Sequence, residues 1–337
     1  MLFNSYKFRN QAARKLLERA KLFSRKTFVS ATPIERDYWL NELKELPEYR
    51  IEWPHAERIT VHTIKCNNPV LAMARDCKAR MKHGGEDNYH IFLNSVEGIS
   101  KIIRLADLPA DQCRVVCSQN QNKDNQSILP PGFHIMTTND QEKLFNFYTS
   151  TCFEGQDIYD ERGRTFIVSE PYKDHTMMDI MTSLIQICGR IRDSKYKTEI
   201  TQYYATSPYK EVTLEEYKES VKRQVEEAKI NADSLNRTTG GVRKSVIEKI
   251  VRWQPYIQEV DDQIVVDENM ANYEIVNYKI VNGQYKTQTL MNNTLAKAGV
   301  NVDSHTTYME EGEEHLMIER TPFKKIFEEY VLLRENV

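Results

Sequence analysis

Short apolar runs alternate with amphipathic stretches of about 10 to 15 residues through the middle of the chain, and this alternation constrains the fold most. The runs predicted as strands are "HIFLN", "RVVCS", "FNFYTST", "TFIVSE" and "EITQYYA". The accompanying predicted helices are "VLAMARDCKARM", "SVEGISKIIRLA" and residues 176–188. Strands that alternate with helices form βαβ units, which build a mainly parallel sheet with helices on both faces. The sequence therefore predicts one α/β domain over residues 60–206.

The segments that flank this domain have a different pattern. Before it, the spacing predicts a helix over 10–23, a short strand "TFVSAT" and a second helix over 34–46. After it, "TLEEYKESVKRQVEEAKINADSLN" carries Glu and Lys at helical spacing, and helix-like segments continue to "FKKIFEEYVLLREN". We therefore expect residues 1–59 to be separate from the α/β domain, and residues 207–337 to form a mostly helical accessory region.

Composition excludes some classes of protein. The 337 residues are 40% apolar, enough for two domains with hydrophobic cores. A net charge of -3 excludes a uniformly basic protein that wraps nucleic acid, although a local groove of Lys and Arg can still bind phosphates. No apolar run approaches the roughly 20 residues of a membrane span, and the N-terminus lacks a signal-like segment. We expect a soluble, cytoplasmic protein with no membrane partner.

The cysteines do not indicate a metal centre. Six cysteines are scattered along the chain, mostly in apolar segments, which favours reduced, buried thiols over disulfides. Cys113 and Cys117 are spaced as zinc ligands can be, but no second Cys or His pair at ligand spacing accompanies them. The sequence therefore predicts no metal site.

Four short motifs occur in a fixed order and carry most of the chemistry. They are "SATP" from Ser30, "HIFLNS" from His90, "YTSTCFEGQDI" from Tyr148 and "QICGRIR" from Gln186. This ordered set resembles the later motifs of superfamily 2 helicases, which are ATP-driven motors that act on nucleic acid. The resemblance covers residues 27–206. It implies a RecA-like fold, the sheet of P-loop NTPases, for the α/β domain.

The resemblance also assigns a role to each matched residue. The residues matched to the coupling of ATP hydrolysis with strand movement are Ser30, Ala31 and Thr32. Those matched to the ATP site are Gly155, Asp157, Gln186 and Gly189. The candidate catalytic arginines are Arg190 and Arg192. The candidate contacts to nucleic-acid phosphates are Asn94, Ser95, Thr149, Ser150 and Thr151.

An arginine at the end of the last motif has a clear chemical use. Phosphoryl transfer needs compensation of charge on the γ-phosphate, and one arginine finger can raise the rate by about 10³ to 10⁵. The final arginine stands two residues after the first instead of the more common three, a form closest to the herpesvirus origin-binding helicases. Either Arg190 or Arg192 can therefore be the finger. The alternative is an ordinary helix C-terminus, where Gly and Arg are expected.

The other motifs also have structural alternatives. Ser30–Thr32 can be a strand-to-helix turn with a hydroxyl cap, and Ser95 can be a helix N-cap. The hydroxyl run Thr149–Thr151 can pack on a sheet. Glu154 and Asp157, three residues apart, more readily hold a loop than form an acid–base pair.

A complete motor needs two further motifs. These are a Gly-x-x-x-x-Gly-Lys-[Ser/Thr] phosphate loop and an Asp-Glu pair for Mg²⁺, and neither stands before Ser30, where the family has them. The nearest decoy, "TGGVRKS" over residues 239–245, has wrongly spaced glycines. We therefore expect residues 1–59 to be the tail of a first RecA-like lobe. ATP and Mg²⁺ would bind only with the missing part of that lobe, so this chain alone would be inactive and its intact parent an ATP-dependent helicase.

Two functions remain open. A motor predicts Arg190 and Arg192 exposed beside the 155–157 loop, with nucleic acid as partner and DNA favoured over RNA. A non-catalytic RecA-like module, docking a replication, restriction or conjugation partner, predicts both arginines paired internally. The tyrosines of residues 270–290 can stack on bases or pack together, and Trp253 and Tyr256 are equally ambiguous.

Overall fold

The computed structural model describes residues 6–51, 57–118, 125–207, 211–238, 254–260 and 263–309. The chain divides into two compact units. The first, here the sheet unit, comprises residues 57–178, 184–206 and the chain from Met291 onward. The second, here the helical unit, comprises the chain up to Ala56 with residues 179–183 and 207–290. Trp253, the turn at 239–245 and the C-terminal helix predicted over 323–336 lie outside the described residues.

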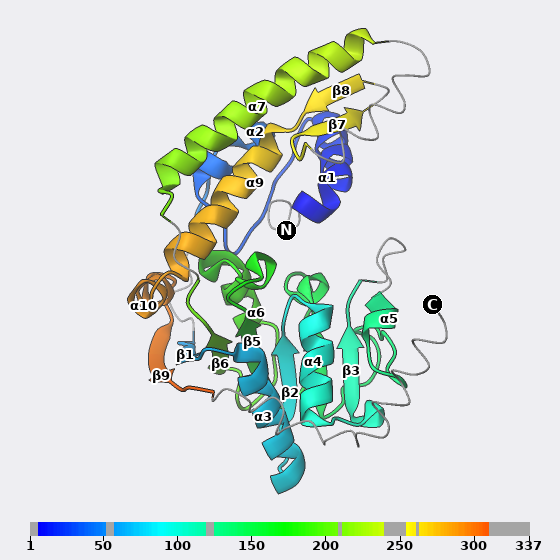
Figure 1. Ribbon diagram of the computed structural model, residues 1–337, viewed down its shortest axis with the longest axis vertical. Coiled ribbons are helices and arrows are strands. Elements are labelled where there is room, and N and C mark those ends of the chain that lie inside the picture. The colour runs from blue at the N-terminus through cyan, green and yellow to red at the C-terminus, as the bar shows by residue number, and fades with distance from the viewer. Residues whose placement is uncertain are drawn as a thin grey trace, which may run out of the picture. The chain divides into compact units, whose positions relative to one another are not determined.

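Seven parallel strands form the sheet, in the order β3-β4-β2-β5-β6-β1-β9 (Figure 1). In that order the strands are β3 (Cys113–Val116), β4 (Phe145–Tyr148), β2 (Asn88–Phe92), β5 (Gly163–Ser169), β6 (Glu199–Tyr204), β1 (Thr60–Lys65) and β9 (Asn301–Thr306). The central strands are largely buried, and each carries several apolar residues, such as Ile91 in β2, Phe147 in β4 and Ile167 in β5. This α/β architecture with a parallel sheet flanked by helices is the one that the sequence predicts.

Two long helices pack on one face of the sheet, and both begin at a side-chain cap. They are α3 (Pro69–His83) and α4 (Val96–Ala106). Asn68 Oδ1 accepts the backbone N–H of Leu71 at 3.1 Å, and Ser95 Oγ accepts that of Gly98 at 3.0 Å. The apolar residues of both helices join strand residues such as Ile91, Phe147, Phe166 and Val168 in one core. This core holds the central strands in place, and the loops that carry the motifs extend from these strands.

The opposite face of the central strands carries a buried polar network. Arg114 donates from Nη2 to Tyr148 Oη at 2.6 Å and from Nε to Asn146 Oδ1 at 3.0 Å. Tyr148 Oη lies 3.0 Å from His90 Nδ1, and His90 Nε2 lies 2.9 Å from Asp160 Oδ2. Burial lowers the pKa of His90, so the neutral ring accepts from Tyr148 and donates to Asp160. Each of the four side chains in this network, Arg114, Tyr148, His90 and Asp160, thus has a hydrogen-bond partner.

Asp160 ends this chain of hydrogen bonds as a carboxylate. Burial acts to raise its pKa, but hydrogen bonds from His90, Asn88 and the backbone N–H of Arg162 outweigh burial and hold the pKa at about 2. Gly163 lies against this pair, because a Cβ there would stand 2.9 Å from His90 Nε2. The network therefore runs from a guanidinium to a carboxylate through two neutral groups.

Several elements differ from the sequence-based expectations. The "TFVSAT" segment forms no strand, and residues 34–46 contain only the short η1 (Arg36–Tyr38) and α2 (Asn41–Lys44). The helix predicted over 176–188 is a π-helix, η5 (Ile180–Leu184), that continues into α6 (Ile185–Cys188). Further short elements in the sheet unit are η2 (Ala110–Gln112), α5 (Asn125–Ile128), η3 (Ser150–Cys152) and η4 (Asp174–Thr176).

The sheet also gains two strands that the sequence does not predict. Most residues of β1 and β9 are polar, and β9 comes from the region expected to be mostly helical. The two pair in register over Thr60–Lys65 and Asn301–Thr306. Their pairing partners lie 241 residues apart, so no local pattern reveals them.

The helical unit has its own core. Its elements are α1 (Tyr6–Lys21), η1, α2, α7 (Leu214–Arg237), β7 (Ile257–Val260), β8 (Gln263–Val266), α9 (Glu268–Lys279), η6 (Ile280–Gln284) and the start of α10 (Gln288–Lys297). Thr213 and Glu216 form a capping box at the start of α7. Apolar residues of α7, such as Val221 and Ala228, pack with Ile264 of β8 and Met270 of α9.

The tyrosines of the helical unit pack inside it. The ring of Tyr278 stacks on that of Tyr217 with centroids 3.9 Å apart. Tyr256 and Tyr285 are buried. For these residues the packing alternative therefore holds.

Candidate functional site

The motifs that contain Asn94 and Ser150 meet at the carboxyl edge of the parallel sheet. Asn94 follows β2, and Ser150 follows the neighbouring β4. Because the two strands are parallel neighbours, the segments meet: the backbone N–H of Ser150 donates to Asn94 Oδ1 at 3.1 Å. Asn94 Nδ2 donates at 2.9 Å to the carbonyl of His175, a residue in the segment that follows β5. Ligands of open α/β sheets bind in the crevice at this edge.

The hydroxyl residues of these segments differ in what they can offer a ligand. Ser95 is the N-cap of α4, the alternative that the sequence left open, and Lys173 Nζ also reaches its Oγ at 3.3 Å. Thr149 is buried, and its Oγ1 lies 3.4 Å from that of Thr151. Ser150 is exposed. Of the predicted phosphate contacts, Ser150 is the most exposed, and Asn94 and Thr151 are partly exposed.

The loop with Gly155 and Asp157 is joined directly to the last motif. The backbone N–H of Ile158 donates to the carbonyl of Arg190 at 2.8 Å, and that of Arg192 donates to the carbonyl of Ile158 at 2.9 Å. Gly155 has a φ of 76°, a conformation that favours glycine. Two motifs about 30 residues apart in sequence thus form one piece of structure.

Arg190 is buried inside this piece, with 7% of its surface exposed. Its Nη1 donates to the carbonyl of Gln156 at 2.6 Å, its Nε to the carbonyl of Gln186 at 2.9 Å, and its Nη2 to Gln186 Oε1 at 3.2 Å. Burial lowers the pKa of this guanidinium, because the charge is taken out of water. The three acceptors offset that cost and lock the loop to the motif.

Arg192 has the opposite environment. Its side chain is 48% exposed, and both Nε and Nη2 donate to one oxygen of Asp157 at 2.9 Å. The Asp157 side chain is 40% exposed. An Arg held by a single exposed carboxylate keeps donors free and can exchange its partner for a phosphate at little cost.

Gly189 has space around it. Its φ is -95°, and a Cβ added there would meet only the carbonyl of Gln186, at 3.7 Å. The fold of this chain therefore does not itself require a glycine at this position. A glycine here leaves the backbone open to close approach.

Ser30–Thr32 belongs to the helical unit, whereas the other motifs belong to the sheet unit. The segment is a bend in which the backbone N–H of Thr32 donates to Ser30 Oγ at 3.3 Å. This is the local hydroxyl turn of the structural alternative. The coupling role of Ser30, Ala31 and Thr32 stays a prediction.

Lys173 is a charged residue at the carboxyl edge of the sheet that the sequence motifs do not include. Lys173, after β5, lies 3.2 Å from Glu97 and 3.3 Å from Glu170, in addition to its contact with Ser95. A single lysine in a loop has no distinctive spacing, so only the packing of the strands reveals it. It adds a cation beside Ser95, at the carboxyl edge of the sheet.

In the part of the chain that the structure describes, no helix has the length and apolar character needed to cross a membrane. Comparison with protein-family models, curated proteins and solved structures finds no match to this chain. The function must therefore be inferred from the residues of the site.

Proposed function

We propose that the chain is the C-terminal portion of an ATP-dependent nucleic-acid helicase or translocase, with the sheet unit as a RecA-like lobe. Support comes from the four ordered motifs and from the parallel sheet, at whose carboxyl edge Asn94 meets Ser150. In this role the lobe supplies an arginine to ATP, and hydroxyl and amide groups to a nucleic-acid backbone. A second lobe with the phosphate loop and the Asp-Glu pair holds ATP and Mg²⁺.

The observation that carries the proposal is the half-exposed guanidinium of Arg192, which pairs with Asp157 of the neighbouring loop. Arg192 is the proposed finger. Arg190 is a positioning residue, because its donors are committed to Gln156 and Gln186 inside the protein. The proposed step replaces the Asp157 carboxylate by the γ-phosphate, so that Arg192 stabilises charge that develops during phosphoryl transfer.

Nucleic acid is the proposed partner at the carboxyl ends of β2 and β4. Ser150 is the proposed direct contact, since its side chain is exposed. Asn94 and Thr149 would act by holding the Ser150 backbone in place. Hydroxyl and amide contacts of this kind position a phosphate backbone without reading its sequence. The proposed binding is therefore independent of base sequence.

The test is nucleic-acid-stimulated ATP hydrolysis by a protein that contains this chain together with a lobe bearing the phosphate loop. Arg192→Ala should lower kcat at least a hundredfold with ATP binding retained, which is a conservative figure for an arginine finger. Arg164→Ala is the matched control, since Arg164 is 41% exposed, pairs with Asp87 and belongs to none of the four motifs. Full activity of the Arg192→Ala protein would rule out the finger.

One observation favours a second candidate, a non-catalytic module that docks a protein partner in replication, restriction or conjugation. That candidate predicts internally paired arginines, and Arg190 is paired in this way. The same assay separates the two functions. Absence of nucleic-acid-stimulated hydrolysis in the wild type would favour the module.

A further inference from the structure

The edge strand β9 is held to the sheet mainly by polar contacts. Five of its six residues are exposed, so burial of apolar surface contributes little to its attachment. It pairs with β1, and on one face Thr63 Oγ1 lies 2.8 Å from Ser304 Oγ. On the other face, two histidines and an aspartate come together. An edge strand with so little burial gains from any additional cross-link.

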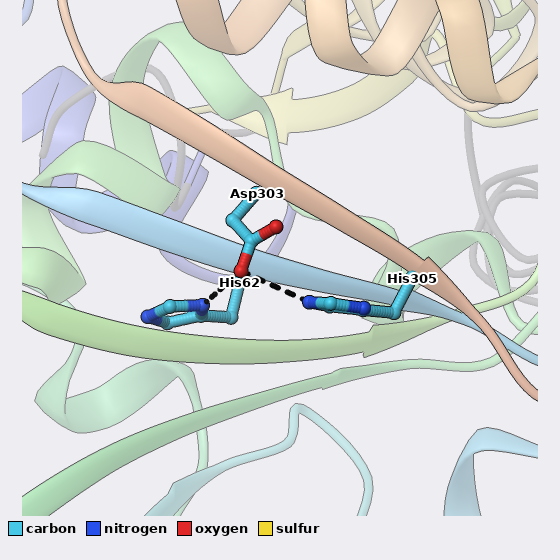
Figure 2. A group of neighbouring side chains, drawn as sticks. All are labelled: His62, Asp303 and His305. Atoms are coloured by element: carbon cyan, nitrogen blue, oxygen red, sulfur yellow. Dashed lines mark hydrogen bonds and ion pairs between the residues drawn. The ribbon is translucent and has the colours of Figure 1, made fainter.

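The histidines share one carboxylate oxygen. His62 Nδ1 of β1 and His305 Nε2 of β9 each lie 2.9 Å from Asp303 Oδ2, and the three candidate ligand atoms lie within 4.8 Å of one another. Figure 2 shows the Asp303 carboxylate between the two imidazole rings. Asp303 and His305 are two residues apart on a strand, so both project from the same face as His62.

A second carboxylate orients the His62 ring. His62 Nε2 lies 2.5 Å from Glu199 Oε2, on β6. When Nε2 carries the proton and donates to Glu199, the lone pair is on Nδ1, which faces Asp303. Metal-bound histidines characteristically donate their other ring N–H to a carboxylate in this way.

We propose that His62, Asp303 and His305 bind a divalent transition-metal ion of the Zn²⁺ type, with Glu199 as the carboxylate behind His62. Imidazole nitrogens and a carboxylate oxygen suit Zn²⁺. Ligand atoms at about 2.0–2.2 Å from a tetrahedral ion stand roughly 3.3 Å apart, so the two 2.9 Å separations need only small shifts. Three protein ligands leave one position for water or another ligand.

This site does not depend on the proposed motor function. Zn²⁺ binding here would revise the expectation of no metal site, which followed from the lack of a second Cys or His pair at ligand spacing beside Cys113 and Cys117. The ion would join β1 to β9 across 241 residues of chain. Metal binding should therefore stabilise the sheet unit and protect the β9 amides from hydrogen exchange.

The experiment titrates Zn²⁺ into tag-free, chelator-treated protein in a calorimeter. Wild type should bind one equivalent, with a rise in Tm and slower hydrogen exchange in peptides that contain β9. His305→Ala should lower Zn²⁺ affinity at least a hundredfold. This side chain is exposed, so its loss should not unfold the protein. Glu199→Gln should weaken binding about 10- to 100-fold, as loss of an outer carboxylate does. Glu57→Gln is the matched control, because Glu57 is an exposed partner of Lys197 outside the site.

Co²⁺ serves as a spectroscopic probe of the ligands. Visible absorption without a thiolate charge-transfer band is expected for two histidines and a carboxylate, whereas a thiolate band would assign the metal to cysteines and overturn the proposal. Equal Zn²⁺ affinity in wild type and His305→Ala would also overturn it. So would the absence of binding heat in wild type at about 1 mM Zn²⁺.

Discussion

Two polar clusters of the sheet unit each contain an arginine and an aspartate, and the clusters differ in how far they are buried. The interior network joins Arg114 to Asp160 through Tyr148 and His90, with all four side chains buried or nearly so. The loop cluster contains Arg192 and Asp157, about half exposed. Both end in a carboxylate that accepts hydrogen bonds of 2.9 Å. The distances are alike, so burial alone must separate their roles.

Burial decides what each cluster can do. Removing one partner of a buried charge leaves another polar group without water, which is costly. An exposed pair loses little when its partner changes, because water replaces it. The interior network is therefore expected to stabilise the sheet. The loop cluster is free to exchange its partner for a ligand.

The largest predicted effect is that of Arg114→Met. The substitution removes one hydrogen-bond donor from each of two buried oxygens, Tyr148 Oη and Asn146 Oδ1, and should lower the free energy of unfolding by about 2–5 kcal/mol. Urea unfolding, with hydrogen exchange of peptides from β2 and β4, measures the loss. Arg192→Met is the matched control and should cost under about 1 kcal/mol. Similar losses at both sites would contradict the comparison.

The sheet illustrates how far sequence reasoning reaches. β2 to β6 were predictable because buried parallel strands are continuous apolar runs. β1 and β9 were not predictable, because most of their residues are polar, as His62 and Asp303 are. The two strands also pair across 241 residues of chain. The pairing register of β1 with β9 therefore depends on tertiary contacts.

The site shows the same limit. The motifs around Asp157 and Arg192 were visible as residue types, and the structure joins them. The burial of Arg190 was not visible, because it depends on carbonyls of Gln156 and Gln186 that only the folded loop supplies. Sequence identifies which groups can act. Packing decides which of them are free.

The second prediction compares two glycines. A Cβ at Gly163 would stand 2.9 Å from His90 Nε2 and 3.2 Å from the carbonyl of Asp160, so Gly163→Ala should cost about 1–3 kcal/mol. Gly189→Ala meets only the carbonyl of Gln186 at 3.7 Å and should change stability by about 0.5 kcal/mol or less. Thermal unfolding of both variants measures the difference. A destabilised Gly189→Ala protein would remove the argument that this glycine serves a ligand.

The third prediction concerns pH. The folded-state pKa of His90 is lowered, so below its ordinary value of 6.5 the unfolded state binds one more proton. Stability should fall as the pH drops from 7 to 5, with His90 contributing at most about 1.4 kcal/mol per pH unit. Asp160 acts in a separate window, because its lowered pKa makes stability fall as the pH drops from 3.8 towards about 2.

The His90 contribution is isolated by His90→Gln, which should flatten the dependence of the unfolding free energy between pH 7 and 5. His134→Gln is the matched control, because His134 is exposed. It should keep the wild-type slope. Equal slopes in wild type and His90→Gln would show that this ring takes up a proton in the folded state.

The last prediction places the same substitution, Asp to Asn, in both clusters. Asp160→Asn weakens charge-assisted hydrogen bonds from His90 and Asn88 and should cost about 1.5–3 kcal/mol. Asp157→Asn removes only the exposed partner of Arg192 and should cost under about 1 kcal/mol. Nitrogen-15 relaxation at Arg192 Nε should show a more mobile side chain in the Asp157→Asn protein. An equal loss of stability at the two positions would mean that Arg192 is held as firmly as the interior network. It would then be a structural residue with no freedom to act on a ligand.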